Sequence, residues 1–428
     1  MLKKLIRVFK DKELRGKIIY VAVMLIIFRL AAHIPIPIVD AERLSDFFNS
    51  NQLLGLLSAF TGGGMENFSL VMLGVGPYIT ASIIMQLLTM IFPQIKEMYQ
   101  ESGEAGRQKF NQYTRYATVP LAMLQGFAMI TLLKNQGIIG NINQFDMAVA
   151  LSLITAGTIF LMWLGELISE KKIGNGVSLI IFAGIVAGLP RVVYETYEIY
   201  IKGGISNEIT SVIALLIIAV IVVLGVVIIT EAQRNIPVSY ARRVRGNKTT
   251  GGVSTFLPLK VNSAGMIPLI FAMSMMIFPG IIASFFVQHS NEMVRSAALF
   301  VSSTFQPGNL IYGVLYFIMV FLFTYFYTSI VFDPKNVAEN LQKHGGFVPG
   351  MRPGTNTADF LGRVLGRITF MGATFLGIIA VIPFIGQALT NITTLAIGGA
   401  SVLIVVGVVL ESIRQIDSQL TMRDYDEF

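Results

Sequence analysis

Uncharged apolar runs about 20 residues long recur along the whole sequence, and they constrain the fold more than any other feature. A helix of that length is sufficient to cross the hydrocarbon core of a bilayer. Of the 428 residues, 54% are hydrophobic and 13% are charged, whereas roughly 25% are charged in a typical soluble domain. These features predict an all-α polytopic membrane protein.

Apolar length and flanking residues predict ten transmembrane helices. The expected segments are about 18–32, 71–92, 114–133, 147–168, 176–193, 210–229, 263–287, 310–332, 368–385 and 394–410.

Basic residues divide unequally between the connecting segments. With a cytoplasmic N-terminus, 26 Lys and Arg fall in the inside segments and five in the outside segments, while Arg29 lies within the first helix. Cytoplasmic loops carry this kind of excess, and an odd number of helices would remove it. We therefore expect a protein of the cytoplasmic membrane with both termini cytoplasmic.

Ten helices divide into two groups of five, and two similar halves of five helices would have opposite orientations. We expect an N-terminal half over 1–205 and a C-terminal half over 206–428. Inverted repeats place their site between the halves, near interrupted helices. The second helix follows a glycine-rich break, and its counterpart, the seventh, carries two glycines and two prolines within 265–280.

The break before the second helix lies in FTGGGMENFSLVMLGVGPYITASIIMQLLTMIFP, residues 60–93. Glycines interrupt this stretch twice, and Met65–Leu73 between them is too short to cross a bilayer. Irregular backbone at membrane depth is tolerated only inside protein or against a water-filled cavity. The pattern therefore predicts a short half-helix, hinged on glycines, beside a lined cavity.

Motifs for catalysis are absent from the sequence. There is no cysteine, no phosphate loop, no nucleophile elbow and no paired-histidine zinc motif. The three histidines are far apart in sequence, so we expect no metal, no cofactor and no enzymatic activity. Glu166 lies near the expected cytoplasmic end of its helix, where snorkelling explains it.

The alternative function is a secondary transporter with inverted repeats. Ion- or proton-coupled transporters place ionisable groups along midplane pathways, and the helix interiors here are nearly free of them. Branched aliphatic residues recur instead, at a spacing of four: Val75 with Ile79, and Val177 with Ile181. Such residues can form a constriction that gates by dewetting, although ordinary helix packing explains the same spacing.

Two expected cytoplasmic loops, 230–262 and 333–367, each exceed 30 residues and mix basic residues with glycine and proline. Loops of this length in compact folds are usually functional. Their charge suits an RNA surface or an acidic protein partner. The alternative is that they only satisfy the positive-inside rule.

Several segments resemble the SecY family, the central subunit of the bacterial Sec protein-conducting channel. These segments are GVGPYITASIIMQLLT (74–89), GEAGRQKFNQYTRYAT (103–118), FLMWLGELISEKKIGNGVSLIIFAGIVAGLP (160–190), STFLPLKVNSAGMIPLIFA (254–272), FTYFYTSIVFDPKNVAENLQKHGGFVPGMRPGTNTADFLGRVLGRIT (323–369) and GGASVLIVVGVVLE (398–411). They extend across nearly the whole chain in the family's order.

The resemblance implies a clamshell of two five-helix halves around an hourglass pore, closed by a plug at about 57–70. The plug residues it implies are Phe60, Gly62, Gly63, Gly64, Met65 and Phe68. The pore ring it implies is Val75, Ile79, Val177, Ile181, Ile270 and Ile404. Positions 75 and 177 carry valine where the family often has isoleucine.

The resemblance also implies a lateral gate between helices two and three on one side and helices seven and eight on the other. The gate residues are Thr80, Gln125, Ser274 and Phe278. Docking residues for a motor or ribosome are Arg242, Arg243, Arg245 and Lys248 in the first long loop and Arg352 in the second. The partners implied are SecE- and SecG-type small membrane subunits, the SecA ATPase, the ribosome, signal sequences, nascent chains and membrane lipid. The pore itself is expected to be passive.

Overall fold

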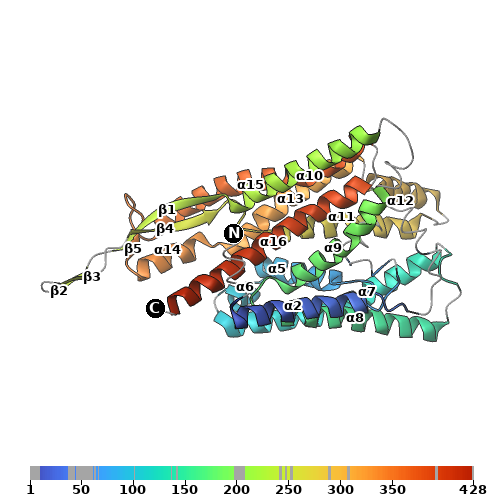
Figure 1. Cartoon of the computed structure of the whole chain (residues 1–428), viewed down its shortest axis with the longest axis horizontal. Coiled ribbons are helices and arrows are strands. Elements are labelled where there is room, and N and C mark those ends of the chain that lie inside the picture. The colour runs from blue at the N-terminus through green and yellow to red at the C-terminus, as the bar shows by residue number, and fades with distance from the viewer. Residues whose placement is uncertain are drawn as a thin grey trace.

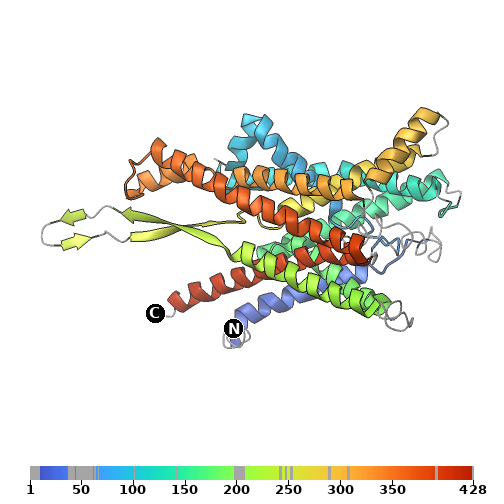
Figure 2. The ribbon, with the colours of Figure 1, turned by 90° about the horizontal axis from the view of Figure 1, so that it is seen from above.

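Long helices lying roughly side by side form most of the computed structural model (Figures 1 and 2). The structure describes residues 10–36, 44, 61, 64–65, 67–100, 102–135, 137–140, 143–196, 208–240, 243–245, 248–250, 254–287, 291–305, 309–390 and 394–426. The helices are α2 (Lys12–Ala31), α5 (Gly76–Ile91), α6 (Pro93–Gln100), α7 (Gly103–Asn135), α8 (Gln144–Glu170), α9 (Gly176–Thr196), α10 (Glu208–Glu231), α11 (Ile267–Phe286), α12 (Glu292–Thr304), α13 (Leu310–Val331), α14 (Pro334–Lys343), α15 (Thr355–Thr390) and α16 (Thr394–Asp426).

Each of the ten expected segments coincides with one of these helices: α2, α5, α7, α8, α9, α10, α11, α13, α15 and α16. Within the described residues, four helices are long and apolar enough to cross a membrane. A fifth is added if α5 and α6, which meet at a bend of 116°, are one broken span. The mainly helical fold is therefore confirmed, and the number of ten crossings stays a prediction.

The expectation of an all-helical protein is wrong in one respect, because the two long loops contain β-structure. Strand β1 (Gln233–Tyr240) pairs antiparallel with β4 (Ser254–Lys260) and with β5 (Gly346–Phe347), which belongs to the second loop. Burial alternates along β1, with Ile236 and Val238 buried, as in a strand that covers a core with one face. The sheet packs on α15 through a buried cluster that includes Ile236 and Leu361.

A second hairpin extends beyond this sheet. Strand β2 (Arg243–Arg245) pairs with β3 (Lys248–Thr250), and Arg245 stands opposite Lys248. Figure 1 shows this hairpin far from the helices, at one end of the molecule. The first long loop is therefore a projecting β-ribbon.

The short half-helix expected over Met65–Leu73 is also wrong for the described residues 64–65 and 67–75, which form consecutive turns. The amide of Met72 donates to the Ser69 carbonyl (2.9 Å). Ser69 forms a β-bridge with Pro35. Phe68 and Gly74 have φ angles of 42° and 57°, a left-handed conformation that a right-handed helix does not allow.

Helix α8 passes very close to this turn segment. A Cβ atom on Gly157 would lie 1.9 Å from the carbonyl oxygen of Leu70 and 3.3 Å from the Cα of Val71. No real side chain tolerates such contacts, so the packing of α8 against the segment requires glycine at this position.

Several segments expected to be cytoplasmic are joined by contacts. Arg115 on α7 forms a salt bridge of 2.7 Å with Glu166 on α8, so Glu166 has a partner as well as a place near the helix end. The Lys171 ammonium lies 4.6 Å from the centroid of the Tyr20 ring. The N-terminal end of α2, the C-terminal end of α16 and the sheet lie at the same end of the molecule (Figures 1 and 2).

Candidate functional site

All six ring residues lie in or against one buried apolar cluster. Val75 is the N-cap residue of α5, and Ile79 lies one turn further along. Val177 and Ile181 are on α9, Ile270 is on α11, and Ile404 is on α16. The exposed fractions of Val75, Ile181, Ile270 and Ile404 are 3%, 2%, 7% and 0%. Ile79 and Val177 are partly buried and pack against the same cluster.

The predicted ring residues come from both halves of the chain. Helix α5 contacts α11, and α9 contacts α16, so each of these pairs joins a helix of the N-terminal half to one of the C-terminal half. The six aliphatic side chains, separated by up to 329 positions in the sequence, thus belong to or pack against one large buried core that includes residues of both halves.

A glycine that no sequence motif singled out brings two helices of the predicted ring together. A Cβ atom on Gly407 would lie 2.1 Å from Cγ of Met266. Met266 is the N-cap residue of α11, and its buried side chain belongs to the same cluster. Gly407 therefore allows α16 to approach the start of α11, one turn from Ile404 on α16 and one turn from Ile270 on α11. The sequence feature that could have indicated this role is the position of Gly407 one helical turn after the predicted ring residue Ile404.

Two of the four gate residues are brought together. Gln125 Nε2 on α7 donates to Thr80 Oγ1 on α5 (3.4 Å), and Thr80 Oγ1 donates to the Gly76 carbonyl (3.0 Å). Ser274 lies on α11, where its hydroxyl donates to the Ile270 carbonyl (2.9 Å). Phe278 is on the same helix, and its side chain is outside the described residues. The Thr80–Gln125 contact therefore lies within the N-terminal half.

The described plug residues belong to a different buried cluster from the predicted ring residues. Met65 and Phe68 are buried in a second apolar cluster with residues of α7 and α8. Gly64 lies beside them, and a Cβ atom there would meet Ser69 Oγ at 3.0 Å. Phe60, Gly62 and Gly63 are outside the described residues. The described part of this segment is thus docked on the N-terminal half.

The expected docking residues share one end of the molecule. Arg243 and Arg245 lie on β2 and Lys248 lies on β3, while Arg242 is outside the described residues. Arg352 is exposed and lies five residues after β5, beside a pocket of about 370 Å³. Because β5 pairs with β1, the sheet brings the two long loops together, which the sequence did not indicate.

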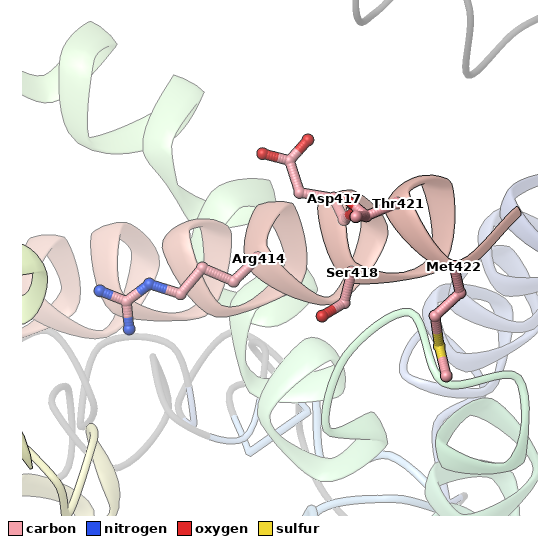
Figure 3. A pocket seen from close by; sticks show the side chains of 5 residues that line it. All are labelled: Arg414, Asp417, Ser418, Thr421 and Met422. Atoms are coloured by element: carbon pink, nitrogen blue, oxygen red, sulfur yellow. The ribbon is translucent and has the colours of Figure 1, made fainter. Parts of the chain in front are cut away.

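A hollow of about 530 Å³ lies on the C-terminal part of α16 (Figure 3). The residues that line it are Arg414, Asp417, Ser418, Thr421 and Met422. These residues are separate from the ring cluster. Among the described residues, no group of three or more histidine and acidic side chains is placed to hold a metal ion.

Solved structures with the same arrangement of helices define the class of fold. The chain aligns with "The structure of a protein conducting channel" with a TM-score of 0.65 and 21% identity, covering 93% of this chain and 90% of the other. It also aligns with "Sec61 in the Canine ribosome-channel complex from the endoplasmic reticulum" with a TM-score of 0.62 and 20% identity, covering 93% and 90%. The fold is that of protein-conducting channels.

Sequence comparison identifies the family within this class. The SecY family model matches residues 69–413. The chain is 41% identical to the protein translocase subunit SecY of Thermotoga maritima, covering 98% of this chain and 96% of the relative. It is also 41% identical to the SecY of Halalkalibacterium halodurans, covering all of both chains. The chain belongs to the SecY family and is a membrane-embedded, protein-conducting channel subunit.

Proposed function

We propose that this chain is a passive pore that lets unfolded secretory polypeptides cross the membrane and releases transmembrane segments sideways into lipid. The observation that carries the proposal is that all six predicted ring residues lie in or against one buried apolar core, on helices that contact each other across the two halves. A narrow apolar constriction excludes water and ions without binding them. The same side chains can move apart and close around an extended polypeptide.

The lateral gate opens between α5 and α7 on one side and α11 and α13 on the other. The contact between α5 and α11 supports this position. A nascent helix of about 20 apolar residues is more stable in lipid than in an aqueous vestibule, so it enters at this seam. Its entry separates the halves and frees the plug, predicted at about residues 57–70.

Energy for transport comes from partners. The SecA ATPase and the ribosome dock on the projecting β-ribbon of the first long loop and near Arg352, while SecE- and SecG-type subunits complete the complex in the membrane. The ribosome–channel complex that contains Sec61 supports a ribosomal partner. Ten crossings in two inverted halves, with both termini on the cytoplasmic side of the cell membrane, complete the proposal. The common end shared by α2, α16 and the sheet supports this orientation.

Reconstitution tests the proposed function against the secondary transporter. The purified chain, with its SecE- and SecG-type subunits, is placed in vesicles and supplied with SecA, ATP and an unfolded precursor. We expect the precursor to become protected from added protease only when SecA and ATP are both present. Uptake of small solutes down an ion gradient, with no protection of the precursor, would instead support the transporter.

Gly157→Val tests the docking of the turn segment. Overpacking typically costs about 1–3 kcal/mol, and this valine displaces Leu70 and Val71, so we expect about a tenfold higher ion leak through resting channels in planar bilayers. Gly188→Val on α9 is the matched control, because a Cβ atom there meets nothing within 4 Å. Equal leak through the two variants would show that this contact does not hold the channel closed.

A further inference from the structure

The β-ribbon of the first long loop, strands β1 to β4, is here called the docking hairpin. Helix α10, which leads into it, packs against α16, and Arg414 of α16 makes hydrogen bonds at the base of the hairpin. Helix α10 ends at Glu231, and β1 begins two residues later. The amide of Val261, after β4, donates to the Ala232 carbonyl (2.9 Å), which closes the base of the ribbon. Arg414 of α16 contacts this base at the end of α10. Its Nε and Nη2 donate to Glu231 Oε1 at 3.0 and 2.8 Å, and Nη2 also donates to the Thr230 carbonyl.

Four charged groups lie at this base. Arg414 and Lys260 are cationic, and Glu231 and Glu411 are acidic. Partial burial, with the nearby Arg414 charge, lowers the pKa of Lys260, while the two carboxylates act in the opposite direction. Arg414 joins α16 by hydrogen bonds to both the side chain of Glu231 and the backbone of Thr230 at the end of α10.

The Arg414–Glu231 ion pair is too exposed to contribute much to the free energy of unfolding. The Arg414 side chain is 30% exposed and the Glu231 side chain is 53% exposed, and ion pairs of this kind contribute little to folding free energy. Its geometry is nevertheless specific, because a planar guanidinium with several fixed donors defines an orientation that an ammonium does not. Figure 3 shows the Arg414 side chain extending along α16 toward that helix's N-terminal part.

Helix α16 connects this base to the ring and to the N-terminal half. Ile404 lies ten residues before Arg414 on the same continuous helix, about 15 Å away at the rise of an α-helix. Beyond Arg414, Gln419 donates to the Lys172 carbonyl and accepts from Lys17 Nζ (3.3 Å). A displacement of α16 therefore acts on a ring residue and on two elements of the other half.

We propose that Arg414 is a positioning residue that couples the docking hairpin to α16, so that a load on the hairpin moves the ring residue Ile404. The inference rests on the proposed function, since it needs a motor that docks on the hairpin and a ring that opens. It adds a route by which docking reaches the pore, through the Arg414–Glu231 contact.

The test is SecA-driven precursor translocation by the reconstituted complex, titrated with SecA. For Arg414→Gln we expect an unchanged SecA concentration at half-maximal rate and a maximal rate lower by about fivefold, at the low end of typical coupling between sites. For Arg414→Lys we expect a maximal rate between those of the parent and of Arg414→Gln, because lysine keeps the positive charge but loses the planar guanidinium with its several donors. The control Arg295→Gln removes an exposed arginine from α12, at a distance of 4.0 Å from Glu292, and should match the parent.

A second measurement does not depend on transport. Spin labels on cysteines at Phe256 of β4 and Met422 of α16, both exposed, report the distance between hairpin and helix. We expect a narrow distribution in the parent and a broader one in Arg414→Gln. A parent-like maximal rate or an unbroadened distribution in Arg414→Gln would overturn the coupling role. Failure of the parent itself to translocate would overturn the proposed function instead.

Discussion

Asparagine at both Ile79 and Ile404 is expected to increase the export of precursors with defective signal sequences by about tenfold or more. Both side chains lie in or against the ring cluster, and Ile404 is fully buried. A buried amide without a partner costs about 1–3 kcal/mol, and about 1.4 kcal/mol is a tenfold change in an equilibrium. This cost destabilises the closed state, in which the two amides are buried. An open, hydrated ring does not bear the cost, because water binds the amides there. A weaker signal then suffices to open the channel.

The control for this prediction is Ile379→Asn. Ile379 of α15 is 2% exposed and lies in the same large cluster as Ile404, but it is outside the predicted ring, gate and plug. General destabilisation affects both variants, whereas loss of the seal affects only the ring variant. Export is measured with a reporter that carries a shortened signal sequence. If the ring variant exports no more reporter than the parent, the ring is not the barrier.

Much of the helical framework could be predicted from the sequence, because an uncharged run of about 20 residues has few alternatives to a helix. Helix ends were less predictable. Helix α7 begins at Gly103 and α16 continues to Asp426, both well outside the apolar segments expected at 114–133 and 394–410. Polar helical residues beyond a membrane segment carry no apolar signal, so hydropathy alone could not place these ends.

The sheet and the ionic contacts could not be predicted. Strand β5 has only two residues, and it pairs with a strand more than 100 positions earlier. Arg115 and Glu166 are separated by 51 positions, and Arg414 and Glu231 by 183. Local periodicity carries no information on such pairs. The ring residues were predicted from the family resemblance, because a spacing of four alone fits ordinary packing equally well.

Locking the two halves together is expected to stop translocation completely. The chain contains no cysteine, so Thr80→Cys on α5 and Phe278→Cys on α11 introduce a unique pair across the proposed seam. Oxidation or a short bifunctional maleimide joins the pair, and mass spectrometry of the linked peptides measures the extent of cross-linking. A tied seam prevents the separation of halves that entry of a nascent helix requires.

The matched control ties two helices of the same half. Thr80→Cys with Gln125→Cys replaces side chains that are in contact at 3.4 Å between α5 and α7, and this link leaves the seam free. The most direct test of the account is therefore protease protection of a precursor in vesicles that carry each cross-linked pair. We predict no protection with the 80–278 link and parent-like protection with the 80–125 link. Undiminished protection with the 80–278 link fully formed would contradict a channel that opens by parting its two halves.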